Sequence, residues 1–350
     1  MNHAATEPRL TSLAHGGGCG CKVAPGVLER ILRGAATPMP VPPRLLVGIE
    51  TSDDAAVYQV NDRQAIVATT DFFMPIVDDP HDFGRIAATN AISDVYAMGA
   101  TPLFALAVVG MPVNVLSAAT IGRILDGGAT ACRDAGIPVA GGHTIDSVEP
   151  IYGLVAIGLV DPALVRRNSG ARPGDVLVLG KPLGVGVLSA ALKKQALDAD
   201  GYACLVDTTT RLNTPGPVLA RLAGVHAMTD VTGFGLAGHA LEMARGSGCR
   251  LRIDRASVPL LPPARELAQA GFVTGASARN WDSYGGRVQL AEDPGGIERA
   301  LLCDPQTSGG LLVACAPDTV GQVLGVFREH AFDAACVIGA AEDGAGLVVD

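Results

Sequence analysis

The sequence is poor in charged residues, and poorest in basic ones. Only 17% of its 350 residues are charged, and 26 Lys and Arg stand against 35 Asp and Glu, for a formal net charge of −9. Nucleic-acid binding needs clustered Lys and Arg to neutralise phosphates. The composition therefore argues against a nucleic-acid partner, although small anions can still bind locally.

The sequence also lacks a long uninterrupted apolar run. Residues 97–122 carry no charge, but Pro102, Pro112 and Asn114 interrupt them, so no piece is long enough to span a bilayer. The first residues have no apolar core of the signal-peptide kind, and the eight cysteines are scattered along the chain. We therefore expect a cytoplasmic protein without membrane association.

Familiar nucleotide-binding signatures are missing as well. There is no Gly-x-x-x-x-Gly-Lys-Ser/Thr loop and no protein-kinase catalytic set. Residues 184–189 imitate a dinucleotide fingerprint, but Ser189 replaces its third glycine, which argues against a nicotinamide site. Two other Gly-rich loops remain. Residues 140–146 could bring backbone N–H groups close to an anion or form an ordinary turn, and residues 304–310 read as a structural turn.

The length and the 48% hydrophobic content predict two cores in an α/β chain. Residues 1–44 read as a flexible Gly-rich lid with a Pro-rich linker, and a polar, turn-rich stretch at 166–174 separates domains at 45–165 and 172–350. The expected first-domain elements are strands at 64–73, 103–111, about 139 and 151–160, and helices at 82–98 and 117–135.

Isolated aspartates stand at the ends of apolar runs. Asp54 follows residues 45–48, Asp71 ends a strand pattern, Asp94 lies on an otherwise uncharged helix one turn after Asn90, and Asp230 precedes a predicted helix. Each alone could be a solvated turn, a satisfied core carboxylate or a helix cap. Together they suit hard divalent cations, which take oxygen ligands and share them with substrate phosphates.

The segment His15-Gly-Gly-Gly-Cys19-Gly-Cys21-Lys22 contains four glycines in eight residues. Such a run should not form a helix, and we expect it to be mobile and to become ordered only over a ligand. No second Cys/His pair at metal spacing exists, so a structural zinc site is disfavoured. We interpret Cys19 as a reactive thiol beside Lys22, which would favour the thiolate and could neutralise a phosphate.

These residues carry a resemblance to the selenophosphate synthetases (selenide, water dikinases) of the aminoimidazole ribonucleotide synthetase superfamily, over nearly the whole chain from Leu10. The matching motifs are residues 15–22, Asp53-Asp-Ala-Ala-Val-Tyr, Thr70-Asp-Phe-Phe-Met-Pro-Ile-Val-Asp, Ala88-Thr-Asn-Ala-Ile-Ser-Asp, Ala140-Gly-Gly-His, Met228-Thr-Asp-Val-Thr-Gly-Phe-Gly and Cys303-Asp-Pro-Gln-Thr-Ser-Gly-Gly. The resemblance implies a two-domain fold of that superfamily, with N-terminal domains pairing into a dimeric β-barrel and a C-terminal α/β domain. It also implies conversion of ATP, selenide and water to selenophosphate, orthophosphate and AMP with Mg²⁺.

The resemblance further implies roles for individual residues. Cys19 matches the catalytic position and Lys22 an essential lysine that also meets the nucleotide. The metal ligands correspond to Asp54, Asp94 and Asp230, and Asp71 matches a further acid at the metal and nucleotide site, where Asp94 also lies. The expected nucleotide contacts in loops are Thr51, Ser52 and Asp53 in one turn, and Gly142, His143 and Thr144 in a loop that reaches ATP across a homodimer interface.

Two rival hypotheses remain open from the sequence. Another superfamily enzyme, such as thiamine-monophosphate kinase or the aminoimidazole ribonucleotide synthetase itself, would keep the aspartates but lack the Cys-Gly-Cys-Lys segment. A non-catalytic selenium or soft-metal carrier would use Cys19 and Cys21 and need no aspartates. The source of selenide stays open, and a selenium-delivery protein is one possible partner.

Overall fold

The first β-sheet belongs to the N-terminal part of the chain. In the computed structural model, which describes residues 7–23, 26–28, 30–31, 41–49, 53–293 and 295–350, this sheet has the strand order β1-β2-β3-β6-β4-β5. Only β4 and β5 pair in parallel. Its strands are β1 (Leu45–Val47), β2 (Ala56–Asn61), β3 (Gln64–Phe73), β4 (Thr101–Met111), β5 (Val139–Asp146) and β6 (Ile151–Val160). The sequence patterns missed β2, whose apolar run is short and mostly exposed.

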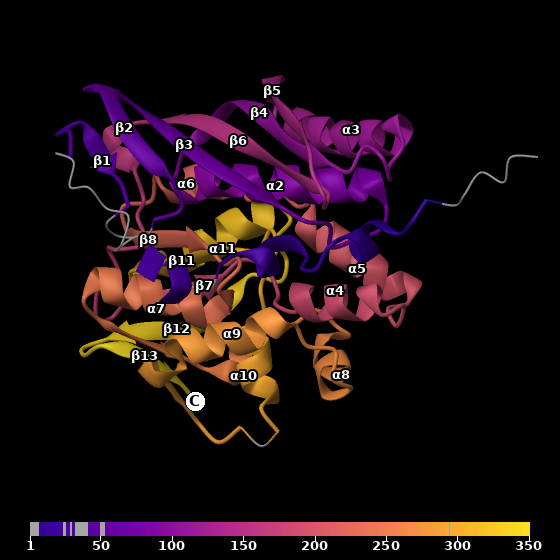
Figure 1. Cartoon of the computed structure of the whole chain (residues 1–350). Helices are drawn as coiled ribbons and strands as arrows, with labels where there is room; N and C mark the ends of the chain where they lie inside the picture. Colours follow the sequence, from indigo (N-terminus) through magenta and orange to yellow (C-terminus); the bar gives the residue numbers. More distant parts are fainter. Residues whose placement is uncertain (1–6, 24–25, 29, 32–40, 50–52, 294) are drawn as a thin grey trace, which may run out of the picture.

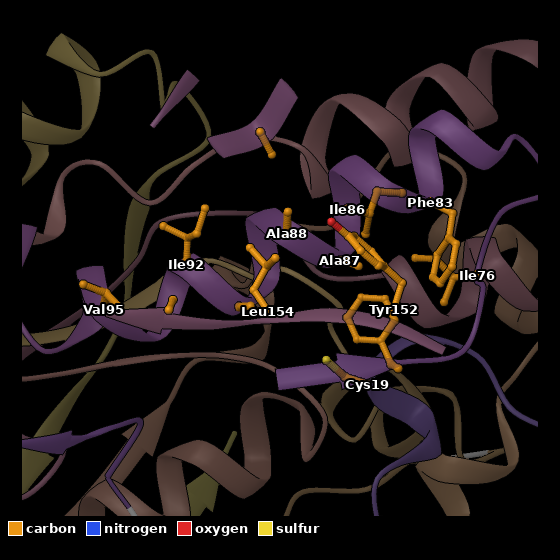
Figure 2. Close-up of a cluster of buried hydrophobic side chains, with 14 of the residues drawn as sticks. Cys19, Ile76, Phe83, Ile86, Ala87, Ala88, Ile92, Val95, Tyr152 and Leu154 are labelled. Carbon is orange, nitrogen blue, oxygen red and sulfur yellow. The ribbon is translucent and has the colours of Figure 1, made fainter. Parts of the chain in front are cut away.

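Two helices, α2 (Pro80–Ala97) and α3 (Ala118–Asp134), cover one face of this sheet (Figure 1). In β3, alternate residues turn towards α2, so Val67, Thr69 and Asp71 are buried while Ile66 and Phe72 face the other side. The core between sheet and helices contains Phe83, Ile86, Ile92, Tyr152 and Leu154 (Figure 2). Apolar burial of this size fixes α2 firmly against β3 and β6.

The C-terminal domain is built on a second mixed sheet with helices on both faces. Its strand order is β10-β13-β9-β12-β7-β11-β8. The strands are β7 (Val176–Leu179), β8 (Val225–Asp230), β9 (Arg250–Ile253), β10 (Val288–Leu290), β11 (Leu311–Cys315), β12 (Cys336–Glu342) and β13 (Gly346–Val349). The helices are α4 (Val185–Lys193), α5 (Ala199–Thr209), α6 (Gly216–Leu219), α7 (Gly235–Ser247), α8 (Ala264–Gln269), α9 (Gly275–Tyr284), α10 (Ile297–Leu302) and α11 (Val320–Glu329).

Alternation along β7 shows how this sheet serves two cores. Leu177 and Leu179 pack into the cluster under α7, whereas Val178 packs into the cluster under α11. A strand buried on both faces reads as a continuous apolar run, as the sequences of β7 and β11 do. Among the described residues, no helix is both long and apolar enough to cross a bilayer.

Helix α2 lies between the two domains. It contacts β3 and β6 on one side and β8, α5 and α6 on the other, as Figure 1 shows. The sequence explains this position, because Asp94 is the one charged residue between Ile86 and Ala97 and a helix that is apolar all round is a buried helix. Its polar side chains Asn90, Ser93 and Asp94 find hydrogen-bond partners inside the protein.

The N-terminal segment departs from the prediction that its glycines exclude a helix. Gly18–Cys21 form one 3-10 turn, η2, and η1 (Leu10–Leu13) precedes it. Residues 26–28 and 30–31 are helical. The turn packs on β3 and α9. Tertiary contacts therefore stabilise a conformation that the local sequence disfavours, although mobility of the segment as a lid stays a prediction.

Candidate functional site

Strand β3 brings Asp71 to the inner face of the first sheet. Its side chain is buried, and Oδ2 accepts hydrogen bonds from Asn90 Nδ2 at 2.6 Å and from the Lys22 ammonium at 3.1 Å. The Lys22 contact is also an ion pair. A carboxylate at the end of an apolar strand is thus compensated by an amide from α2 and a cation from the N-terminal segment.

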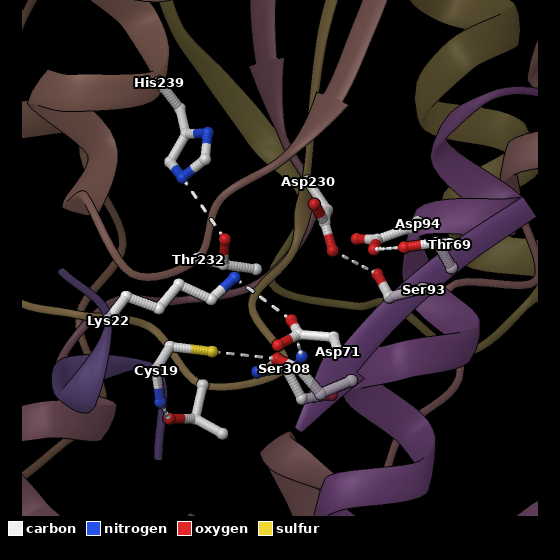
Figure 3. A network of polar contacts seen from close by, with 12 residues as sticks. Cys19, Lys22, Thr69, Asp71, Ser93, Asp94, Asp230, Thr232, His239 and Ser308 are labelled. Carbon is white, nitrogen blue, oxygen red and sulfur yellow. Dashed lines mark hydrogen bonds and ion pairs between the residues drawn. The ribbon is translucent and has the colours of Figure 1, made fainter. Parts of the chain in front are cut away.

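Helix α2 presents Asn90, Ser93 and Asp94 on one face, because residues three and four apart lie together on a helix. Asp94 Oδ2 accepts from Thr69 Oγ1 at 2.5 Å, within the N-terminal domain. Ser93 Oγ donates to Asp230 Oδ2 at 2.5 Å, across to the C-terminal domain. Figure 3 shows these side chains converging from α2, β3 and β8.

Strand β8 contributes Thr229 and Asp230 from the C-terminal domain. Asp230 is its last residue, and α7 begins five residues later at Gly235, so Asp230 precedes a helix as predicted but ends a strand and does not cap that helix. Thr229 Oγ1 donates to Asp54 Oδ1 at 2.7 Å, which ties Asp54 to the same edge. The other oxygen, Asp54 Oδ2, is buried and has no hydrogen-bond partner among the described residues.

The pKa shifts of these carboxyl groups reflect how close together they lie. Burial raises the pKa of Asp54 and of Asp94 well above its usual range, and the charge of Asp230 raises both further. Burial also raises the pKa of Asp230 itself. Like charges in a low-dielectric site disfavour ionisation of one another. The structure therefore brings together the three acids that the sequence places far apart.

Lys22 is the cation of this cluster. Burial alone would lower the pKa of its ammonium, but Asp71, Cys19 and Asp94 reverse that effect and raise the pKa well above the usual value. Its charge is therefore retained at all physiological pH values. The ammonium donates to one Asp71 oxygen at 3.1 Å. A phosphate oxygen is an equally suitable acceptor for this donor.

Cys19 lies at the edge of the first core and is 1% exposed (Figure 2). Its Sγ donates to Asn90 Oδ1 at 3.2 Å. Burial raises the pKa of the thiol well above its usual value, and the opposing effect of Lys22 is smaller. Lys22 therefore acts in the predicted direction, towards the thiolate, but in this conformation desolvation outweighs its charge and the pKa of the thiol is raised overall.

The remaining predicted residues lie elsewhere or outside the described part. Gly142, His143 and Thr144 are exposed on edge strand β5, three strand spacings or roughly 14 Å from β3. Gly142 is required there, because a Cβ would lie 2.2 Å from the Ala107 carbonyl oxygen. Asp53 Oδ1 accepts from the Asn168 N–H at 2.8 Å. Thr51 and Ser52 fall outside the described residues.

Several polar residues of the site were missed from the sequence. They are Thr69, Ser93, Asn213 and Thr229, all of which contact the carboxylates or Ser93. Ser93 could have been found from the sequence, because a polar residue on a helix that has no exposed face must be buried and needs a polar partner. Asn213 gave no signal, because its loop lies about 120 residues away and only folding brings its Nδ2 to Ser93 Oγ, at 2.7 Å.

No three His, Cys, Asp or Glu side chains in the described ranges already stand as a metal-binding group. Mg²⁺, however, keeps several waters and is usually bound by one or two carboxylates together with substrate phosphates. The crowded acids 54, 94 and 230 are hard oxygen donors for which no ion pair is found among the described residues, and one Asp54 oxygen also lacks a hydrogen-bond partner there. The residues present therefore fit a Mg²⁺ ion that arrives with a nucleotide.

Comparison with known proteins identifies relatives of both domains. Residues 52–160 match the AIR synthase related protein, N-terminal domain, and residues 172–350 match its C-terminal domain. The selenide, water dikinase of Dechloromonas aromatica is 68% identical over 336 residues, 96% of either chain. That of Pseudomonas straminea is 65% identical over 97% of this chain and 96% of its own.

Solved structures share the fold at low identity. A thiamine-monophosphate kinase from Stenotrophomonas maltophilia superposes with a TM-score of 0.62 at 22% identity, covering 94% of this chain and 96% of its own. HypE in a HypE–HypF complex gives 0.66 at 17% identity, covering 93% and 95%. At such identities the likeness concerns the fold alone. The expected two-domain fold of this superfamily is thereby confirmed.

Proposed function

Since this chain belongs to the selenide, water dikinase family, we propose that the acidic cluster between its domains is where ATP, selenide and water become selenophosphate, orthophosphate and AMP. Family membership rests on identities of 64 to 68% over nearly the full chain. The observation that carries the site is the convergence on α2 of acids from both domains with Lys22 and Cys19.

The stoichiometry sets what the site must do. Conversion of ATP to AMP releases two phosphoryl groups, of which one ends on selenium and the other takes its fourth oxygen from water. Both transfers build negative charge on phosphate oxygens, so the site needs cations and must exclude bulk water from the first acceptor. The described residues supply one ammonium and a lid-like turn, and the acids require a further cation.

We assign Mg²⁺ to the acids Asp54, Asp71, Asp94 and Asp230, the last of which is buried and shared between domains through Ser93. Bound there with the nucleotide, the ion would neutralise polyphosphate charge and orient the phosphates. Thr69, Ser93 and Thr229 hold Asp94, Asp230 and Asp54 in fixed orientations through their hydroxyl groups. Such oriented carboxylates would bind metal with little reorganisation.

Lys22 and Cys19 are assigned as the catalytic pair. The Lys22 ammonium would leave Asp71 for an oxygen of the transferred phosphoryl group and stabilise its charge. The Cys19 thiol is neutral and buried beside Asn90, so it would border the selenide position as a soft, uncharged group. Asp53, with Thr51 and Ser52, is assigned to contact the nucleotide.

The outer face of the first sheet supports a homodimer. In the described part, no helix covers this face (Figure 1). It carries partly exposed apolar side chains from four neighbouring strands, namely Tyr58, Ile66, Phe72, Phe104, Leu106, Val155, Ile157 and Leu159. An apolar sheet face of this extent requires a partner. Pairing of two such sheets would form the barrel and place β5, with Gly142, His143 and Thr144, next to the partner's nucleotide.

The cysteine residues bear on where the protein works in the cell. All eight cysteines are free thiols, which supports the cytoplasm as the location. The half-exposed Cys21 lies at the surface end of the turn and could meet a selenium-delivery protein.

The nucleotide product tests the function directly. We expect AMP and selenophosphate to form from ATP only when selenide is added, in equal amounts, with orthophosphate. ADP as the final nucleotide would indicate a kinase of the thiamine-monophosphate type, and binding of selenium without ATP turnover would indicate a carrier. Either result would overturn the proposal.

A further inference from the structure

The loop Asp304–Gly310, between α10 and β11, is buried at every position. The sequence suggested only a structural turn. Buried loops are unusual because each polar backbone group must find a partner. The hydrogen-bond partners of this loop therefore indicate its role in the structure.

One set of contacts anchors the loop to its own domain. Asp304 Oδ2 accepts from the N–H groups of Gly186 and Val187, and Gln306 Oε1 accepts from those of Gly184 and Val185, so the two side chains cap the start of α4. The buried Lys181 ammonium donates to the Ser308 carbonyl at 2.7 Å. These contacts fix the loop independently of the N-terminal segment.

A second set of contacts leads from the loop to Cys19. Thr307 is 2% exposed, and its Oγ1 accepts the hydrogen bond of the Cys19 N–H at 2.9 Å. The Ser308 N–H donates to Asn90 Oδ1 at 2.7 Å, the same oxygen that accepts from Cys19 Sγ. The loop thus holds the backbone of Cys19 directly and orients the acceptor of its thiol.

Steric fit supports the same contact. Gly18, with φ of +51°, lies so close that an added Cβ would be 2.1 Å from Thr307 Oγ1 and 2.5 Å from Ile76 Cγ2. A side chain at this position would push the turn away from the loop. Gly20 also meets the loop, with its Cβ position 3.3 Å from Pro305 Cγ.

We propose that Thr307 is a positioning residue for the selenophosphate reaction: its hydroxyl docks the Cys19 turn onto the C-terminal domain and so closes the site. This inference rests on the proposed function. Without the docking bond the turn spends less time closed, so Cys19 and Lys22 are less often in place while the acids remain intact.

The test compares Thr307→Val, which keeps the shape and removes the acceptor, with Thr307→Ser, which restores it. Thr209→Val is the matched control, since Thr209 is also fully buried but its hydroxyl donates to the Leu205 carbonyl of its own helix. The first readout is the rate at which iodoacetamide alkylates Cys19 without nucleotide, resolved from Cys21 by peptide mass spectrometry. The second is kcat and KM for ATP in selenide-dependent AMP formation.

For Thr307→Val we expect alkylation of Cys19 about tenfold faster and kcat about tenfold lower, the size of one hydrogen bond, with KM for ATP changed much less. Thr307→Ser should recover most of both effects, and Thr209→Val should match the parent protein. Equal alkylation rates for Thr307→Val and the parent would overturn the proposal. So would equal effects of Thr307→Val and Thr209→Val.

A second variant guards against misfolding of Thr307→Val. Gly18→Ala attacks the same contact from the turn and should accelerate Cys19 alkylation similarly, whereas Gly122→Ala, whose Cβ position is open, should not. Alkylation needs no turnover, so it separates the two proposals. Faster alkylation in Thr307→Val without any AMP formation by the parent would keep the docking role and reject the proposed function.

Discussion

At the scale of single residues, the site combines the ammonium of Lys22 with four carboxyl groups. Lys22 pairs with Asp71, but Asp54, Asp94 and Asp230 face one another with raised pKa values. Mutual repulsion of these acids costs stability, and a bound cation, as proposed above, would relieve it. Two substitutions probe the two signs of charge separately.

Lys22→Ala should abolish selenophosphate formation, by at least about 100-fold, because it removes the ammonium that would stabilise the transferring phosphoryl group. The circular dichroism spectrum should be unchanged, since Lys22 is an exposed residue that follows the turn and belongs to no helix or strand. Lys194→Ala, at a lysine that contacts only the Phe272 ring among the described residues, should keep full activity. Normal product yield from Lys22→Ala would remove Lys22 from the mechanism.

Asp230→Asn should stabilise the metal-free protein and abolish the stabilisation by Mg²⁺ and a non-hydrolysable ATP analogue. Acids whose folded pKa is raised contribute stability that is present at low pH and lost as pH rises through the folded pKa. The Tm difference between Asp230→Asn and the parent in EDTA should therefore grow from pH 5 to pH 8. Differential scanning fluorimetry measures it.

Asp333→Asn provides the control for this prediction, because Asp333 is exposed and lies in the turn between α11 and β12. Its Tm should follow that of the parent at every pH. A Tm for Asp230→Asn below that of the parent in EDTA at pH 8 would contradict the repulsion described above.

At the scale of elements, helix α2 decides the geometry of the site. It joins the domains, and it approaches α3 at glycines whose added Cβ atoms would meet backbone: 1.9 Å from Ile124 O for Gly84 and 2.0 Å from His81 O for Gly127. This contact sets how far α2 stands from α3, and hence where Asn90, Ser93 and Asp94 lie. Replacing one glycine should therefore move the site.

Gly127→Ala should destabilise the protein by about 1–3 kcal/mol, the usual cost of overpacking, and reduce AMP formation. Gly122→Ala on the same helix meets nothing within 4 Å and should stabilise it by up to about 1 kcal/mol, as alanine does in helix interiors. Urea unfolding measures both changes. Equal stabilities of the two variants would mean that α2 and α3 are not so closely packed.

At the scale of the whole molecule, the uncovered sheet face predicts the assembly. Phe72→Glu places a charge on that face near the end of β3, where Phe72 is 46% exposed in the monomer. We expect the variant to be monomeric by analytical ultracentrifugation, while the parent is dimeric. Its AMP formation should fall if β5 of one subunit completes the partner's site.

Val273→Glu is the matched control for the dimer prediction, since Val273 is 43% exposed but belongs to the C-terminal domain. It should remain dimeric. A monomeric parent protein, or a Phe72→Glu variant that stays dimeric, would reject pairing through this face.

The sequence determined the family, the two-domain architecture and most central elements, because α2, β7 and β11 are buried and read as apolar stretches, while β3 is a long strand that alternates buried and exposed residues. It also singled out Cys19, Lys22 and the four aspartates, since charge within apolar runs is conspicuous. Peripheral strands such as β2 and β10 escaped it, because short, exposed strands lack such patterns.

Only the tertiary structure decided how those residues act together. Burial, which local sequence does not encode, makes Cys19 a protonated thiol despite the neighbouring Lys22 and folds its glycine-rich segment into a turn. Contacts between residues more than a hundred positions apart, such as Cys19 with Thr307 and Ser93 with Asp230, depend on how two domains dock on α2. Desolvation and long-range packing are properties of the folded chain, so a one-dimensional pattern could name the chemical groups but not their protonation or their partners.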